Sequence, residues 1–266
     1  MKKADSKRDK YGRKVSGLIM DVDMSCPTVI AHARQVNDIN AFMSRQHIDP
    51  DCHYAFHRLF NQGDAAGFNW NKGGRLYSLG GGYQSYPQTD RKLIKINGEP
   101  VVEIDIRASH LTILHALMKI PFDPSTDPYG IADLPRSVVK SWVTMTLGND
   151  KFQEKWSDGA KERFQEEFGQ KLQAEYPLKE TRTKILSRLP ILSNWETSPY
   201  RWGELQYLES CAIIDAVHKL AMVHKVCALP VHDSLIVPIS QQAIAEKVLK
   251  EEFNRHIGVV PIITVK

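Results

Sequence analysis

The sequence is poor in cysteine and contains no pair of cysteines spaced as C-x-x-C. Its four cysteines lie far apart, at positions 26, 52, 211 and 227, so we expect free thiols in a reducing compartment rather than a disulfide framework. No cluster of cysteine and histidine has the spacing of a transition-metal site. With 16 glycines, 14 prolines and no internal repeat, the chain is also unlike a disordered, fibrous or solenoid protein.

A long apolar run and a strong excess of one charge are absent as well. The basic start, MKKADSKRDKYGRK, leads into no hydrophobic stretch, so we expect a solvated tail and neither a signal peptide nor a membrane span. The 35 Lys and Arg residues against 31 Asp and Glu residues give a net charge of +4, which is compatible with a polyanionic partner without indicating one. With 266 residues, 42% of them hydrophobic, the chain can bury the core of one large domain or of a domain with a subdomain.

Strand signals are strongest in two places. LIKINGEPVVEIDI, residues 93–106, has two β-rich runs joined at an Asn-Gly pair and predicts a hairpin. In its second run apolar residues alternate with Glu103 and Asp105, so these two carboxylates share one face of the strand. VHDSLIVP, residues 231–238, predicts a second hairpin whose tip carries Asp233.

The other periodic segments predict mainly helices. They are residues 28–62, the stretch after residue 106, a segment with Asp133 as N-cap and Pro135 in its first turn that ends near Leu147, and the stretches 151–188, 202–224 and 243–256. Between them, residues 63–90 predict a long loop or irregular hairpin, and VVPIITVK predicts a last strand. Strands and helices in this order predict an α+β fold, with an antiparallel sheet covered on one face by helices.

Two of the predicted strands carry an aspartate at one end, Asp105 in EIDIRASH and Asp233 in VHDS. If the strands are neighbours in one sheet, the two carboxylates meet at the same edge; taken singly, each is equally well an exposed turn residue. Carboxylates that converge repel each other unless a divalent cation lies between them, and hard oxygen ligands suit Mg²⁺ or Mn²⁺. A pair of such ions stabilises the attacking and leaving oxygens in phosphoryl transfer.

A predicted cationic helix lies between the two aspartates in the sequence. LPRSVVKSW places Arg136 and Lys140 four residues apart, on one face and near a helix N-terminus, which favours binding of a phosphate group. Taken alone, such a pair is more often a solvated helix face. Its position between Asp105 and Asp233 gives the phosphate interpretation its weight.

Several motifs in order resemble the palm and fingers of family A DNA polymerases, the group of bacterial DNA polymerase I. That family has four motifs in a fixed order: T-G-R-L-S, N-L-Q-N-I-P, R-x-[IL]-R and D-Y-S-Q-I-E-L-R. This sequence has matching residues in the same order, namely Gly74-Arg75-Leu76, Tyr83-Gln84-Ser85-Tyr86-Pro87, Arg91 and Asp105. Downstream, RSVVKSW resembles the R-x-x-x-K fingers helix, LQYLESCAIIDAVHKL the Q-x-x-A-A-D helix, ALPVHDSLIVP the V-H-D-E hairpin and VVPIITVK the closing strand. The resemblance runs from about Gly73 to Lys266.

The resemblance implies a polymerase palm, in which an antiparallel sheet is backed by helices, with a small helical fingers subdomain and a reduced or absent thumb. Four regions follow from it: a basic tail and helical lead-in over 1–72, the palm entry and first catalytic strand over 73–132, a helical fingers-like subdomain over 133–200, and the palm with the second catalytic hairpin over 201–266.

The resemblance also implies roles for individual residues. Asp105 and Asp233, with the backbone carbonyl of Ile106, would bind two Mg²⁺ or Mn²⁺ ions. Arg136 and Lys140 would bind the nucleoside triphosphate, and Lys140 would also be the catalytic general acid toward pyrophosphate. The residues implied to contact primer–template or single-stranded DNA are Arg75, Gln84, Gln206 and His232.

Some positions depart from the family pattern and concern the nucleotide. His110 stands where the family has the glutamate that screens against the ribose 2′-hydroxyl, and Thr144 stands where its fingers helix has a large aromatic residue. Both are therefore expected to be nucleotide-binding, and the choice between dNTP and rNTP stays open. Ser234 gives the hairpin the H-D-S of the single-subunit phage-type RNA polymerases, which share this palm.

The sequence therefore predicts a template-directed nucleotidyltransferase, either a DNA polymerase or a primer-synthesising polymerase, that replicates a phage or mobile element in the cytoplasm of a bacterial or phage-infected cell. The expected partners are primer–template or single-stranded DNA, nucleoside triphosphates and an accessory protein that adds grip on DNA, with no membrane. Two alternatives stay open: a non-catalytic palm that binds nucleic acid in a replication complex, and a two-metal nuclease. The nuclease is the weaker one, because hydrolysis does not need the Arg136 and Lys140 pair.

Overall fold

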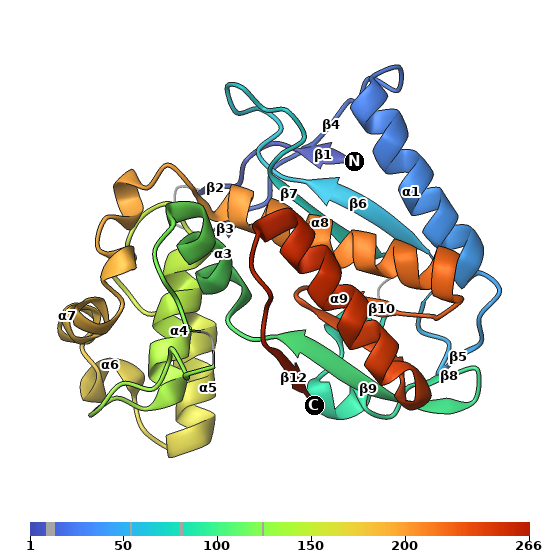
Figure 1. Cartoon of the computed structure of the whole chain (residues 1–266). Coiled ribbons are helices and arrows are strands. Elements are labelled where there is room, and N and C mark those ends of the chain that lie inside the picture. Colours follow the sequence, from blue (N-terminus) through green and yellow to red (C-terminus); the bar gives the residue numbers. More distant parts are fainter. Residues whose placement is uncertain (9–13, 54, 80–81, 124) are drawn as a thin grey trace. The chain divides into compact units, whose positions relative to one another are not determined.

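The chain divides into two compact units in the computed structural model, which describes residues 1–8, 14–53, 55–79, 82–123 and 125–266. The first unit contains Met1–Ala116 and Gly203–Lys266, and the second contains Leu117–Trp202. The sheets belong to the first unit, whereas the described part of the second unit is built from helices and short turns (Figure 1). The predicted α+β fold is confirmed.

The first unit contains two larger sheets and one small one. The sheet with Asp105 has the strand order β10-β11-β9-β8-β5, with β12 also paired to β9; the second sheet has the order β4-β1-β6-β7, and β2 pairs with β3. All these pairs are antiparallel except β1 with β6. The strands are β1 (Lys2–Lys3), β2 (Lys7–Arg8), β3 (Lys14–Val15), β4 (Ile19–Met20), β5 (Ile48–Asp49), β6 (Phe56–Phe60), β7 (Gly73–Ser78), β8 (Lys95–Ile96), β9 (Glu99–Ile106), β10 (Leu229–Val231), β11 (Ser234–Pro238) and β12 (Ile263–Val265).

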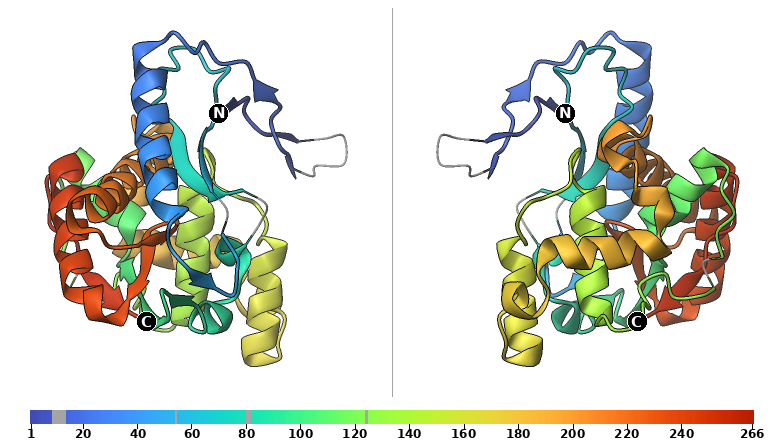
Figure 2. Two further views of the ribbon diagram at one scale, coloured as in Figure 1. Left: turned by 90° about the vertical axis from the view of Figure 1, so that its right-hand side faces the viewer. Right: turned by 90° about the vertical axis from the view of Figure 1, so that its left-hand side faces the viewer.

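Long helices cover these sheets. Helix α1 packs on β6, and α9 packs on β9 and β11, as Figures 1 and 2 show from different sides. The helices are α1 (Pro27–Met43), α2 (Gln88–Arg91), α3 (Ser109–Met118), α8 (Trp202–Lys219) and α9 (Gln242–Ile257), and a π-helical turn, Leu220–His224, extends α8. None of the described helices combines the length and apolar character that crossing a bilayer requires.

The predicted hairpin over residues 93–106 is confirmed as β8 and β9. Asn97 and Gly98 form its two-residue turn, with φ angles of 52° and 82°. Two successive positive φ angles match the twist of the flanking strands and suit Asn-Gly, which is why so short a signal was sufficient. All five residues of β11 are buried, so both faces of this strand are covered, and four of the five residues are apolar.

The helix predicted over residues 28–62 is wrong beyond Met43, where α1 ends. Residues 48–49 form β5, and residues 56–60, FHRLF, form β6 with a strictly alternating burial pattern. A period of two places Phe56, Arg58 and Phe60 on the buried face of a strand, and Pro50 has no amide hydrogen to continue a helix. The spacing of the apolar residues in this segment is compatible with the period of a helix and with that of a strand. The segment forms a strand because β1 and β7 pair with it.

The second unit is held together by tryptophans. Its helices are α4 (Arg136–Leu147), α5 (Asp158–Phe168), α6 (Leu172–Glu175) and α7 (Leu178–Arg188). Trp142, Trp156 and Trp195 are at most 2% exposed, and the indole N–H groups of Trp156 and Trp195 donate to backbone carbonyls of Tyr176 and Asn149 at 2.9 and 2.6 Å. Buried indoles with satisfied N–H groups add apolar area without an unpaired donor.

The start of α4 differs from the prediction. Asp133 is not its N-cap; Pro135 occupies that position and no side chain caps the helix. Asp133 has a φ of 64°, whereas a residue that caps a helix has backbone angles of the β region. Its carboxylate is therefore not placed to accept from the first amides of the helix. The predicted end of the helix at Leu147 is confirmed.

Candidate active site

The two predicted catalytic strands are neighbours. In the antiparallel pair of β9 and β11, Asp105 lies opposite Ser234, the residue that follows Asp233. The backbone amide of Ile106 donates to the carbonyl of Asp233 at 3.1 Å. The tip of the second hairpin is thereby attached to the end of the strand that carries Asp105, across 128 residues of sequence.

The turn at this tip explains how Asp233 is presented. His232 and Asp233 connect Val231 to Ser234, which pair with each other across the hairpin. His232 adopts a φ of 56°, a left-handed conformation that histidine tolerates better than most side chains. The loop is the shortest that closes an antiparallel hairpin, so Asp233 stands on a rigid support.

The pKa of Asp233 depends on its burial and on the charged groups near it. Its pKa is raised from 3.8 to about 7, first by burial and then by the negative charges of Glu209 and Asp105. Asp105 itself is 19% exposed at its side chain and pairs with the ammonium of Lys266 at 2.5 Å. Three carboxylates thus share one region of the first unit, and a cation on Asp105 already relieves part of their repulsion.

The donor atoms of this region fit a divalent cation. Asp105 and Asp233 offer hard carboxylate oxygens whose mutual repulsion a Mg²⁺ ion would neutralise, and Mg²⁺ is commonly bound by one or two carboxylates together with substrate phosphates and water. Lys266 donates to Oδ2 of Asp105, so this lysine would compete with a metal ion for that oxygen. Ile106, predicted to contribute its carbonyl, is buried at the end of β9, and this role stays a prediction.

Glu209 is the residue of this region that the sequence did not single out. It lies on α8 with 1% exposure; Arg75 of β7 donates from Nε to its Oε1 at 3.1 Å and from Nη2 to the same atom. His110 Nε2 is 3.2 Å from its Oε2. Burial by itself would raise the pKa of Glu209, but Arg75 and His110 outweigh it and hold the pKa well below its usual range. One signal was present: a glutamate interrupts the apolar stripe of α8.

A second buried carboxylate, Glu103 of β9, is hydrogen-bonded to the hairpin that carries Asp233. Its two oxygens accept from Arg91 at 3.0 and 3.1 Å, and the Ser234 hydroxyl donates to Oε1 at 2.8 Å. Glu103 is two residues before Asp105 on the same face of β9, and Ser234 follows Asp233. The network of Arg91, Glu103 and Ser234 therefore fixes the spacing of the two catalytic candidates without taking part in the site itself.

We expect Ser234→Ala to lower the free energy of unfolding by about 1 kcal/mol, because Glu103 loses a neutral donor and keeps Arg91. Urea denaturation measures this loss. Ser240→Ala is the matched control, since Ser240 Oγ also donates to a glutamate, Glu99, but on the surface, where a change near zero is expected. Equal effects of the two substitutions would show that burial of the network is unimportant.

The residues predicted to contact nucleic acid differ in which protein groups their side chains are bonded to. Arg75 and His232 are close, with Nη1 of the arginine 3.5 Å from Nδ1 of the histidine. The amide of Gln84 is used internally: it donates to the carbonyls of Leu76 and Pro230 and accepts from the amide of Ser78. Gln206, one turn before Glu209, accepts from Asn61 at 2.8 Å. Gln84 thus braces the hairpin in this structure, and its contact with DNA stays a prediction.

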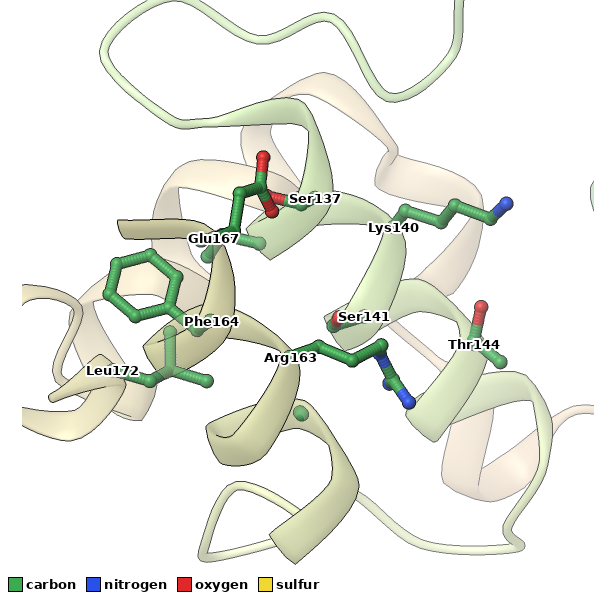
Figure 3. A pocket seen from close by; sticks show the side chains of 10 residues that line it. Ser137, Lys140, Ser141, Thr144, Arg163, Phe164, Glu167 and Leu172 are labelled. Atoms are coloured by element: carbon green, nitrogen blue, oxygen red, sulfur yellow. The ribbon is translucent and has the colours of Figure 1, made fainter. Parts of the chain in front are cut away.

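The predicted nucleotide-binding residues of the second unit lie on the exposed face of α4. Arg136 pairs with Asp127 at 2.6 Å and lies over the ring of Tyr129. Lys140 and Thr144 line a pocket of about 460 Å³ between α4 and α5. Figure 3 shows Lys140 extending outward from α4 and Arg163 reaching from α5 toward Thr144. This face offers cations and hydroxyl groups, which suits a phosphate-bearing ligand.

A different cluster also has the composition of a metal site. Among the described residues, ligand atoms of Asp215, Glu252 and His256 lie within 4.8 Å of one another. Arg255 bonds to Asp215 at 2.7 Å and to Glu252 at 2.5 Å, and His256 Nε2 is 2.7 Å from Asp215. Arg255 and Lys219, which is 3.1 Å from Glu252, therefore already balance the two carboxylates of this cluster.

Comparisons with known proteins give likenesses among solved structures alone. No model of a known protein family matches the sequence, and no curated protein matches it. Among solved structures, the chain is similar to the polymerase domain of Pol1 from M. smegmatis in complex with DNA primer-template and dNTP, with 14% sequence identity and a TM-score of 0.46. The similarity covers 99% of this chain and 57% of that chain, so this chain spans little more than half of that polymerase domain.

Proposed function

We propose that this chain is a metal-dependent, template-directed nucleotidyltransferase of the family A polymerase type, which adds nucleotides to a 3′-hydroxyl as a DNA polymerase or primer-synthesising polymerase of a phage or mobile element. The observation that carries the proposal is the pairing of β9 with β11, which sets Asp105 beside Asp233. The cationic, hydroxyl-rich face of α4 supports it, because a nucleoside triphosphate needs such a partner.

In this proposal, Asp105 and Asp233, with the carbonyl of Ile106, bind two Mg²⁺ or Mn²⁺ ions. When bound, the ions stabilise the attacking and leaving oxygens of the displacement. Arg75 and His232 contact the primer end. Gln84 and Gln206 also bind the nucleic acid.

The second unit supplies the groups for the triphosphate. Arg136 and Lys140 neutralise its charge, and Lys140 gives a proton to the leaving pyrophosphate, which makes that group a better leaving group. His110 and Thr144 are the further residues proposed to bind the nucleotide. An accessory protein is proposed to add grip on the duplex, because the resemblance to the palm and fingers of the family implies a reduced or absent thumb.

The test is to incubate the protein with a labelled primer on a DNA template, Mg²⁺, and dNTPs or rNTPs in separate reactions. Extension of the primer supports the proposal. Shortening of the primer would instead identify a nuclease, and tight binding without any change of length would identify a nucleic-acid-binding module. An unprimed single strand in a parallel reaction determines whether synthesis starts without a primer.

We expect Lys140→Ala to raise the KM for nucleotide roughly 10-fold or more, because a charge-assisted contact to phosphate is worth about 1.5–3 kcal/mol. The Kd for primer–template should stay within about twofold of its original value. Steady-state extension kinetics and fluorescence anisotropy measure the two quantities.

Lys161→Ala is the matched control for Lys140→Ala. Lys161 is a lysine of the neighbouring helix α5 that pairs with Asp158 at 2.8 Å. It should change neither quantity. If Lys140→Ala weakened nucleotide and DNA binding equally, its assignment to the triphosphate would be wrong.

A further inference from the structure

A pocket of about 390 Å³ lies in the first unit at helix α1 and strand β6, which pack against each other (Figure 1). None of the residues proposed above to bind metal, nucleotide or nucleic acid lines this pocket. Its walls are mainly apolar, and the ionisable side chains in its described lining are one arginine and two histidines, with no Asp or Glu. A mostly apolar pocket of this size with a few polar groups is typical of a small-molecule site.

Arg58 of β6 brings to the pocket a buried positive charge that no carboxylate contacts. The residue is 5% exposed, and its guanidinium donates to the carbonyl of Gly74 at 2.8 Å, to Nδ1 of His32 at 2.8 Å and to Sγ of Cys211 at 3.4 Å. Burial raises the pKa of Cys211, so this acceptor is a neutral thiol. Among the described residues, the hydrogen-bond acceptors of Arg58 are therefore all neutral, and a buried charge without a counter-charge is unfavourable.

His32 of α1 offers the pocket a hydrogen-bond donor. Because arginine can only donate, Nδ1 of His32 accepts from Arg58, and the proton of the neutral ring lies on Nε2. Burial and then the positive charge of Arg58 lower the pKa of His32 to about 4, so the ring is neutral at neutral pH. Nε2 is closed off from solvent and has no hydrogen-bond partner among the described residues. A ligand with an acceptor atom would satisfy this buried donor.

His57 of β6 adds a second unpaired ring nitrogen to the same lining. Its Nδ1 is also buried and has no hydrogen-bond partner in the described part of the chain, while its ring stacks on Tyr77 with 5.9 Å between centroids. Burial lowers the pKa of His57, so this ring is neutral as well. The pocket therefore combines one permanent positive charge with two neutral imidazoles.

This combination favours an anion with an apolar body. A carboxylate carries one charge and needs few donors, whereas a phosphate monoester carries nearly two charges and three acceptor oxygens at neutral pH. The donors of Arg58 and of the two histidines are too few for a phosphate in an otherwise apolar pocket. The side chains of Val36, Phe56 and Phe60 belong to the apolar lining and suit an aromatic or aliphatic group.

We propose that this pocket binds a small carboxylic acid with an aromatic or aliphatic body. The carboxylate accepts from Nε2 of His32 and neutralises the charge of Arg58, while the body packs on the apolar walls. The site does not depend on the proposed polymerase function, because its residues are separate from those of the candidate active site and its ligand is recognised by other groups.

Binding of naphthylacetate to the full chain tests the proposal, with calorimetry for the Kd and NMR spectra of the histidine ring nitrogens for the contact. Naphthylacetate is expected to bind and to shift the Nε2 resonance of His32. Naphthylacetamide has nearly the same shape without the charge, and naphthyl phosphate has a second charge. The Kd of each is expected to be roughly 10-fold higher or more, because a hydrogen bond to a charged group is about twice as strong as a neutral one.

Two variants locate the ligand. Ala33→Leu fills part of the pocket from α1 without removing a buried polar group, since Ala33 is in its lining, and the Kd of naphthylacetate should rise roughly 10-fold or more. Ala31→Leu is the matched control, because Ala31 is exposed on the same helix outside the lining, and the Kd should not change. His32→Phe keeps a ring but removes the donor, so the preference for the acid over the amide should disappear.

Three results would overturn the inference: no binding of naphthylacetate to the wild-type chain, binding that Ala33→Leu leaves unchanged, or an amide or phosphate that binds as tightly as the acid. The second result stays decisive even if His32→Phe fails to fold. Primer extension is not measured in this experiment, so failure of the proposed function would leave this inference standing, and its own failure would leave the proposed function untouched.

Discussion

Asp105→Asn and Asp233→Asn are each expected to lower the rate of nucleotide incorporation by about 1000-fold or more. Each substitution removes a charged oxygen ligand while preserving the shape of the side chain. Metal ions contribute several kcal/mol of transition-state stabilisation in phosphoryl transfer, and about 1.4 kcal/mol corresponds to a factor of ten. Because both aspartates act on the same ions, the double variant should be hardly slower than either single variant.

Single-turnover extension of a labelled primer measures these rates, with primer–template binding as a parallel readout that should change little. Asp215→Asn is the matched control, since Asp215 belongs to the other cluster with the composition of a metal site. It is expected to retain incorporation, because Arg255 already balances its charge. If Asp215→Asn abolished synthesis and Asp105→Asn did not, the reaction centre would lie at α8 and α9 instead.

Asp233→Asn is expected to make the metal-free protein more stable, and only at higher pH. The pKa of Asp233 in the folded chain is about 7, against 3.8 for an ordinary aspartate, so the folded state binds its proton more tightly than the unfolded state. Stability therefore falls as pH rises from about 4 to about 7 and stays reduced above that range. Asparagine has no charge to bury, so the variant should gain about 2 kcal/mol at pH 8 and almost nothing at pH 4.

Urea unfolding in the presence of a chelator, at pH 4 and at pH 8, measures this gain. Asp158→Asn is the control with the opposite sign: hydrogen bonding and charge from Lys161 lower the pKa of Asp158, so removing its carboxylate should not stabilise the protein at either pH. Added Mg²⁺ should reduce the advantage of Asp233→Asn, because an ion bound to the wild-type carboxylates stabilises the folded state. A gain that is the same at both pH values would mean that packing, not charge, is responsible.

Several elements could be read directly from the sequence because their signals are local. The Asn97-Gly98 pair encodes the two positive φ angles of its own turn, and the stripe of α8 repeats with the helical period along one segment. The end of α1 could not be read in this way. Residues 56–60 become a strand because β1 and β7 pair with them, and those partners are distant in the sequence.

The same distinction applies to the candidate site. The sequence predicted that Asp105 and Asp233 each stand at the end of a strand, but it left open whether those strands are neighbours; the pairing of β9 with β11 decided this. The partners of the buried charges were not predictable. Glu209 reaches Arg75 over 134 residues and Lys266 reaches Asp105 over 161, and no spacing rule relates positions so far apart.

The amino-acid sequence alone determined the chemical types at the site and the turns that present them, because turn geometry and strand alternation depend on neighbouring residues. Only the tertiary structure decided which charges meet. A buried carboxylate requires a cationic partner, but the sequence contains 35 lysines and arginines, and packing selects among them. The choice of Arg75 and His110 for Glu209 is therefore a property of the folded chain.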